Sequence, residues 1–198
     1  MVAYVFDDIL LKGVRAGQVP AREKVARDWY RKKAKQTRVK DTQIMRTPDT
    51  SRLKNKSAMG RMQFFYYDPK HKKTLPYYDR FPLIFPIDKA KGGFLGLNFH
   101  YLPYRQRAAL MDKLYPLVNN EKYDETTRIK ASYSILKGAA KYRWFKPAIK
   151  HYLSKHVRSR FLTVEASEWD IALFLKVAAW EKKSQSEVFK DSRAIMQR

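Results

Sequence analysis

Residues 60–102 constrain the fold most, because their aromatic residues, prolines and glycines favour short strands over helices. GRMQFFYY is an aromatic run closed by an Asp-Pro pair, which is typical of a turn. Pro82 and Pro86 interrupt RFPLIFPI, and because proline cannot donate a ladder hydrogen bond, we expect an edge or bulged strand there. In GGFLGLNFHYL, Gly92 predicts a hairpin turn with the glycine after it, and Gly96 predicts a bulge or a close backbone approach.

Helical patterns lie on both sides of these strands. Residues 4–16 carry an apolar stripe that includes Ile9, and AREKVARDWYRKKAKQ, which follows Pro20, places Val25 and Trp29 on one helix face. After residue 102 the pattern is mainly helical, in PYRQRAALMDKLYPLV, DETTRIKASYSILKGAA, PAIKHYLSKHV and SEWDIALFLKVAAW, while SRFLTV is either a strand or an extended link. The prediction is an α+β chain with a small antiparallel β-barrel-like sheet and a C-terminal helical part.

The segment from residue 37 to residue 59 is polar and has no periodicity, so we expect an extended, basic N-terminal arm that orders on a partner. The domain organisation that follows is a helical segment and arm over residues 1–59 and a globular domain over residues 60–198, with strands to residue 102. The chain is long enough for one domain with an arm.

Charge indicates the class of partner. The 198 residues include 42 Lys and Arg against 19 Asp and Glu, a formal net charge of +23. Such an excess repels itself and is best tolerated beside a polyanion, most commonly nucleic acid, although an acidic protein surface or an anionic membrane would also serve.

The chain has no cysteine, which excludes disulfides and thiolate chemistry, and no apolar run approaches membrane-spanning length. The N-terminus has two acids where a signal peptide needs basic residues.

The strongest candidate site is the stretch from residue 126 to residue 164, which has ten Lys and Arg residues and no acid. Cations at intervals suit a phosphate chain, and interleaved aromatic residues can stack on unpaired bases. We nevertheless expect Trp144, Phe145, Tyr152 and Phe161 to turn inward to the core more readily than outward. The residues predicted to bind the polyanion are Lys141, Arg143, Lys146, Lys150, Lys155, Arg158 and Arg160.

A second basic group lies in RKKAKQTRVK. Basic arms often follow phosphates or enter grooves, but a solvated tether or a peptide that threads onto neighbouring subunits would have the same composition. The candidate contacts are Arg31, Lys32, Lys33, Lys35, Arg38 and Lys40.

A third candidate is a protein interface made of paired aromatic residues. Because neighbouring residues of a strand point to opposite faces, half of each pair should be exposed, and exposed tyrosine is common at interfaces. The alternative is the partly wet aromatic girdle of a small barrel. The predicted interface residues are Phe65, Tyr67, Tyr77, Tyr78 and Phe81.

Catalytic and metal chemistry are not expected. None of the four histidines has a carboxylate pair beside it, and His151 and His156 do not share a helix face. A metal-dependent nuclease needs clustered carboxylates. Glu181 forms a Glu-x-Lys triplet without a preceding strand aspartate, and Asp68, Asp79 and Asp88 could converge but are more typical of turns. No phosphate-binding loop or nucleophile elbow is present, so we predict no enzyme, no metal and no cofactor.

Several runs resemble a small virion-associated protein family of T4-like contractile-tailed bacteriophages. They are YYDPKHKKTLPYYDRFPLIFPI, GGFLGLNFHYLPYRQRAALMDKLY and SRFLTVEASEWDIALFLKVAAWEKKSQSEVFKDS, which together span roughly residues 60–192. The resemblance supplies no catalytic residues. It implies a structural component of the virion, in the tail, baseplate or neck, made in the host cytoplasm and assembled with other virion proteins in a symmetric ring or hetero-assembly.

Two further hypotheses remain beside the structural one. The chain could be a phage-encoded nucleic-acid-binding protein of the infected cell, or a metal-dependent nuclease. The phage genome, as double-stranded DNA, is a partner under the structural and the nucleic-acid-binding hypotheses. No membrane partner is expected under any of the three. The scarcity of acids argues against the nuclease.

Overall fold

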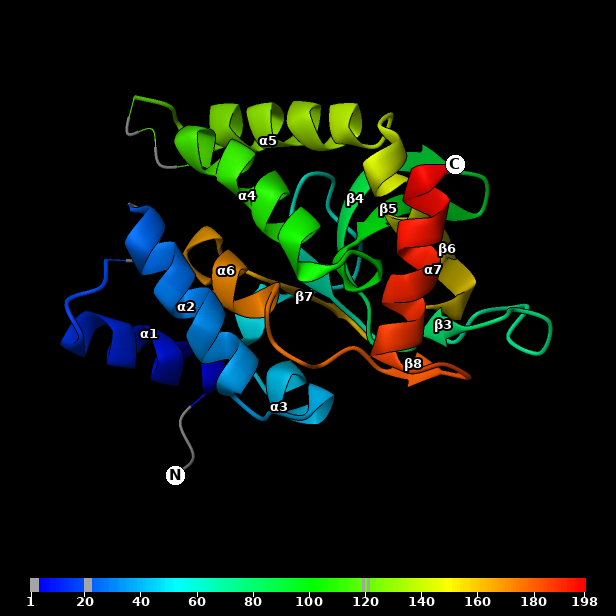
Figure 1. Ribbon diagram of the computed structural model, residues 1–198, viewed down its shortest axis with the longest axis horizontal. Helices are drawn as coiled ribbons and strands as arrows, with labels where there is room; N and C mark the ends of the chain where they lie inside the picture. The colour runs from blue at the N-terminus through cyan, green and yellow to red at the C-terminus, as the bar shows by residue number, and fades with distance from the viewer. Residues whose placement is uncertain (1–3, 20–22, 119, 121) are drawn as a thin grey trace.

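The computed structural model describes residues 4–19, 23–118, 120 and 122–198. Helices lie on either side of an antiparallel sheet (Figure 1), which confirms the α+β class. The sheet is open, not a closed barrel, with the strand order β1-β7-β2-β4-β5-β6, and a two-stranded ribbon pairs β3 with β8. The strands are β1 (Leu53–Lys54), β2 (Gln63–Phe64), β3 (Tyr78–Asp79), β4 (Leu83–Ala90), β5 (Gly93–Asn98), β6 (Ile149–Leu153), β7 (Phe161–Thr163) and β8 (Trp180–Glu181).

Helices occupy most of the remaining chain. The α-helices are α1 (Val5–Arg15), α2 (Lys24–Gln36), α3 (Asp41–Met45), α4 (Tyr104–Val118), α5 (Glu125–Ala139), α6 (Trp169–Ala172) and α7 (Gln185–Gln197). The 3-10 turns are η1 (Thr50–Arg52), η2 (Phe99–Tyr101), η3 (Arg143–Ala148), η4 (Ser154–His156) and η5 (Ala166–Glu168). Pro20, where the second helix was expected to begin, lies outside the described residues.

The two longest strands form the hairpin that the glycines predicted. β4 and β5 pair through a turn in which Gly92 has a φ of 74°, a conformation that favours glycine. The register shifts between Pro86 and Asp88, so the predicted bulge is confirmed, but β4 lies inside the sheet and not at its edge. A Cβ on Gly96 would lie 3.1 Å from Ile84 Cδ1, which is the close approach expected at this position.

Both faces of the sheet are covered. Phe64 belongs to the large core cluster, whereas the next residue, Phe65, belongs to a second cluster that contains Phe94, Tyr152 and Phe161. Alternation therefore holds from Phe64, at the end of β2, to Phe65, but neither side of the chain meets solvent there. The prediction that Phe65, Tyr67 and Phe81 would be exposed interface residues is wrong for this reason, since all are buried. Tyr77 and Tyr78 are half-buried.

Residues 147–157 are not the helix that was expected. Ile149–Leu153 form β6, which pairs with β5 and ends the sheet on that side. The five-residue strand alternates, with Tyr152 buried and His151 exposed, and pairing with β5 outweighs local helix preference. SEWDIALFLKVAAW is likewise only briefly helical, in α6.

Helix α2 is present, but a different face of it is buried. Ala26, Tyr30 and Ala34 are buried, four residues apart, whereas Val25 is 70% exposed. Small side chains at two of these positions let α2 lie close to its neighbours, α1 and α6. Because this face of α2 is buried instead of the predicted one, Arg31 is also buried.

The segment from residue 37 to residue 59 is packed rather than extended into solvent. It forms α3 and η1, and β1 pairs with β7. Ile44 is fully buried, and Arg52 forms an ion pair with the buried Glu168. A single hydrophobic cluster includes Phe6 and Tyr30 together with Phe85 and Leu136, so the core takes side chains from both sides of residue 60.

Candidate nucleic-acid interface

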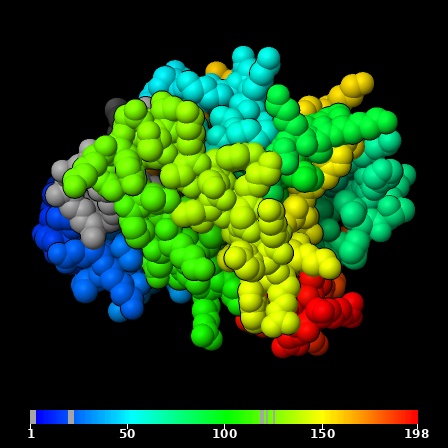
Figure 2. All heavy atoms as spheres, turned by 90° about the horizontal axis from the view of Figure 1, so that it is seen from above, coloured from blue at the N-terminus to red at the C-terminus, as the bar shows by residue number. Residues whose placement is uncertain are grey.

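The basic segment from residue 141 to residue 160 includes β6, the last strand of the sheet on that side, and then passes beside residues 66–68 toward β7. In Figure 2, which looks onto α4 and α5, the yellow spheres of its first half lie beside the yellow-green spheres of α5. The turn η3 carries Arg143 and Lys146 before β6, and η4 carries Lys155 after it, so the strand separates two groups of charge. The exposed members are Lys141, Arg143, Lys146, Lys155, Arg158 and Arg160, and Lys150 is half-buried.

This surface is poor in compensating acids. The Arg158 guanidinium lies 3.6 Å from Asp68, whose carboxylate also binds Lys72 Nζ at 2.9 Å. Within the part of the chain that the structure describes, the other exposed cations of the segment form no ion pair. The positive potential here is therefore largely uncompensated, as a phosphate-binding surface requires.

Two aromatic side chains are exposed beside these cations. Tyr142 is 64% exposed and Trp144 is 46% exposed, and the Arg143 guanidinium carbon lies 4.9 Å from the centroid of the Trp144 ring. The expectation of a core position is wrong for Trp144, whereas Tyr152 and Phe161 are buried as expected and Phe145 is half-buried. Trp144 and Tyr142 line a groove of about 600 Å³ between α4, α5 and η3.

The second predicted cation group is divided by the fold. Arg31 is buried, and its guanidinium contacts Asp170 at 2.6 Å and Asp112 at 2.8 Å. Burial alone would lower the pKa of Arg31, but the two carboxylates raise it, so the side chain serves packing between α2, α4 and α6. The prediction that Arg31 contacts a polyanion is therefore wrong. Lys35 packs its ammonium 4.7 Å from the Tyr104 ring centroid. Lys33 is half-buried, and the exposed cations are Lys32, Lys35, Arg38 and Lys40.

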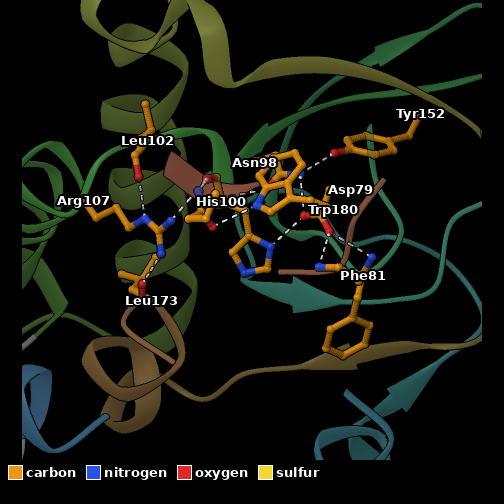
Figure 3. Close-up of polar contacts among 11 residues, drawn as sticks. Asp79, Phe81, Asn98, His100, Leu102, Arg107, Tyr152, Leu173 and Trp180 are labelled. Atoms are coloured by element: carbon orange, nitrogen blue, oxygen red, sulfur yellow. Dashed lines mark hydrogen bonds and ion pairs between the residues drawn. The ribbon is translucent and has the colours of Figure 1, made fainter. Parts of the chain in front are cut away.

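A buried polar network connects the sheet to the C-terminal part of the chain (Figure 3). Asp79 Oδ2 lies 2.6 Å from His100 Nδ1, and Asp79 Oδ1 accepts hydrogen bonds from the backbone N–H groups of Phe81 and Ala179. Asn98 donates to Asp79 at 3.3 Å and to Tyr152 Oη at 3.0 Å. Burial would raise the pKa of Asp79, but His100 and these hydrogen bonds lower it below the ordinary value.

Arg107 extends this network without a carboxylate partner. Its guanidinium donates to the carbonyl oxygens of Leu102 at 2.7 Å, Leu173 at 2.5 Å and His100 at 3.2 Å. Complete burial lowers the pKa of Arg107 to about 10. The side chain therefore joins the segment at residues 100–102 to the carbonyl of Leu173, because buried carbonyl oxygens need hydrogen-bond donors.

No local pattern in the sequence indicated these buried polar residues. Asp79 was interpreted as a turn residue, and its partner His100 follows a glycine-rich strand with no charged neighbour. The three turn aspartates have separate partners, since Asp68 pairs with Lys72 and Asp88 with Lys137.

Among the described residues, no group of three or more histidines and acids could hold a metal ion. No described helix is long and apolar enough to cross a membrane.

A second cavity, of about 550 Å³, lies between β6 and the segment that leads into β3. Lys150 lines it with its ammonium 4.0 Å from the Tyr101 ring centroid, and burial lowers the pKa of Lys150 to about 8. This residue is thus the one member of the predicted basic set between 141 and 160 whose charge is withdrawn from the open surface.

Comparison with known protein families distinguishes the virion-component hypothesis from the nucleic-acid-binding hypothesis. A family model described as "Phage T4 terminal DNA protecting protein" matches residues 6–196. The chain belongs to this family. No curated protein and no solved structure matches it.

The family confirms that this is a T4-like phage protein and corrects the function that the resemblance implied. The family description names the protection of terminal DNA and does not name a component of the tail, baseplate or neck. The structural hypothesis is therefore wrong, and the nucleic-acid-binding hypothesis agrees better with the family. Phage DNA becomes the plausible partner in place of other virion proteins.

Proposed function

We propose that the chain binds the ends of linear double-stranded phage DNA in the infected cell and protects them without catalysing a reaction. The observation that carries this proposal is the largely uncompensated set of exposed cations from Lys141 to Arg160, which lie before and after β6 in the chain. The family description, which names terminal DNA, supports the same partner.

Binding to the duplex follows from the cations. Each Lys or Arg that neutralises a phosphate releases a condensed counterion, and this gain is independent of base sequence. A protein that protects ends of any sequence needs such contacts more than it needs base readout.

Preference for an end needs a feature that the interior of a duplex does not offer. A DNA end exposes the flat face of its last base pair, and exposed aromatic rings stack on such faces. Trp144 and Tyr142 are exposed among the cations, so the same surface offers both kinds of contact. The cations hold the phosphates while Trp144 covers the terminal base pair, and an exonuclease is thereby kept from the end.

The experiment is an exonuclease protection assay on linear duplex DNA, with the same DNA closed by hairpins at both ends as competitor. We expect the protein to slow degradation of the open duplex, and we expect closed competitor to displace it less well than open competitor. The protein alone, with Mg²⁺ or Mn²⁺, should leave the DNA intact. Absence of protection, or equal competition by closed DNA, would overturn the proposal.

Two charge-matched variants locate the surface. Lys141→Glu/Arg143→Glu/Lys146→Glu should weaken binding on the order of tenfold or more, because three phosphate contacts become repulsive. Lys32→Glu/Arg38→Glu/Lys40→Glu removes as much charge from α2 and the segment after it, and should protect nearly as well as the wild type. If the first variant protects like the wild type, the proposed surface is wrong.

A further inference from the structure

Lys150 differs from every other cation of the basic segment in its surroundings. Its side chain leaves the exposed edge of β6, lines the cavity beside that strand, and places its ammonium 4.0 Å from the Tyr101 ring centroid. Within the described part of the chain, no carboxylate forms an ion pair with it. A withdrawn ammonium group without a counter-charge is costly, and such groups are normally paired in the folded protein.

The other polar groups of the cavity do not supply the missing charge. Lys70 and His71 line it from the loop before β3, and His151 lines it from β6, so these three groups add no negative charge. Asp79 also lines the cavity, but its carboxylate already accepts hydrogen bonds from Asn98 and from two backbone N–H groups and contacts His100. The cavity therefore carries a net positive charge, and the Lys150 ammonium in it has no carboxylate partner among the described residues.

The walls indicate what kind of anion fits. The cavity of about 550 Å³ is larger than a phosphate group needs, and Tyr77 and Tyr101 form part of its lining. Aromatic walls beside a cation suit a phosphate that is attached to a sugar and a base. A phosphodiester inside a duplex continues in both directions and cannot enter such a cavity, whereas a phosphate monoester at a strand end can.

We propose that this cavity binds the terminal phosphate monoester of a DNA strand, with Lys150 as its principal cation. The inference rests on the proposed function and adds how an end is recognised. A monoester carries close to two negative charges near pH 7, against one for each internal phosphate. The same pocket thus selects for ends by charge as well as by access. The lowered pKa of Lys150 agrees with this, because it reports an ammonium that gains when a counter-charge arrives.

The experiment compares the affinity for one duplex with different chemistry at its single open end. The other end is closed by a hairpin, and the open end carries a 5′-phosphate, a 3′-phosphate or only hydroxyl groups. We expect wild type to bind one of the phosphorylated ends about tenfold more tightly than the hydroxyl end, as charge-assisted hydrogen bonds allow. Which strand end is preferred identifies the source of the monoester.

The decisive variant is Lys150→Met, which keeps the aliphatic stem and removes the charge. It should lose the preference for the phosphorylated end and keep the wild-type affinity for the hydroxyl end. Lys155→Met, an exposed cation in η4, is the matched control and should weaken both ends equally. Lys150→Arg keeps the charge and should retain part of the preference. A thermal melt of each variant confirms that it is folded.

Several results would overturn this inference and leave the proposed function standing. They are equal affinity of wild type for phosphorylated and hydroxyl ends, or equal loss at both ends in Lys150→Met. Inorganic phosphate should compete with the phosphorylated end selectively, and equal competition at a hydroxyl end would mean a bulk ionic effect that also contradicts the site. Failure of the proposed function has a separate signature, namely no preference for any open end over DNA closed at both ends.

Discussion

Asp79 shows how a single buried carboxylate organises its surroundings. It is 3% exposed and joins β3 to His100, Asn98 and the backbone just before β8. Turn aspartates usually bond only nearby backbone, as Asp79 does with Phe81 N–H, and the interpretation of Asp79 as a turn residue did not indicate its long-range contacts. Those contacts depend on residues about 20 and 100 positions away, which no local pattern encodes.

Asp79→Asn should lower the free energy of unfolding by about 1–3 kcal/mol at pH 7, because buried donors lose their charged acceptor. The pKa of Asp79 is lowered in the fold from an ordinary value of 3.8, so its contribution is present above that pH and is lost as pH falls through the folded pKa. Urea unfolding at several pH values measures both effects. The difference between wild type and variant should shrink below pH 4, and a difference that stays constant would contradict the assignment.

Lys150 gives the phosphate site a pH dependence. In the folded protein without DNA, burial lowers the pKa of Lys150 to about 8. Raising the pH from 7 to 9 therefore neutralises most of the ammonium and should reduce the preference for a phosphorylated end. Lys70, His71, His151, Asp79 and Tyr101 also face the cavity, so the slope must be compared with that of Lys150→Met. The variant should show no such fall in this interval. A parallel fall in both proteins would assign the titration to another group.

At the scale of elements, helices were easier to predict than their faces. The segments predicted as helices over residues 4–16 and 21–36 contain α1 and α2, but the buried face of α2 follows Ala26 and Tyr30 instead of Val25. A helix-forming sequence does not specify which stripe meets the core when alanines compete with larger apolar residues. Residues 147–157 were misassigned because a short strand at a sheet edge depends on its partner β5 more than on its own composition.

The contact between α2, α4 and α6 rests on Arg31 and its carboxylates. Arg31→Met should lower the free energy of unfolding by about 3–5 kcal/mol, because Asp170 remains buried without its cation. Adding Asp170→Leu should recover part of that loss, since the uncompensated charge is then gone. Chemical denaturation of wild type, both single variants and the double variant measures this coupling. Lys32→Met, on the exposed side of α2, serves as the control and should change stability little.

The candidate site was predictable to the extent that it depends on charge along the chain. The cations from Lys141 to Arg160 were found from sequence because acids are missing over a long stretch, which is a local property. The withdrawal of Lys150 and Arg31 from the surface was not predictable, because it depends on which residues the sheet and the helices bring beside them.

At the scale of the whole molecule, the net charge of +23 should make DNA binding strongly dependent on salt. Replacing Lys141, Arg143 and Lys146 with alanine should reduce the slope of log affinity against log salt by about 0.9 for each phosphate that is no longer neutralised. Titrations between low and physiological salt measure the slope for wild type and variant. An unchanged slope would show that these side chains do not neutralise phosphates.

The strand order has a consequence for how the protein is made. β7, at Phe161–Thr163, lies between β1 and β2, two strands that the ribosome completes about a hundred residues earlier. The central sheet therefore stays incomplete until most of the chain has emerged, and such non-local pairing is slow. Nascent chains stopped before β7 should remain sensitive to protease, so folding of this protein belongs to the end of translation.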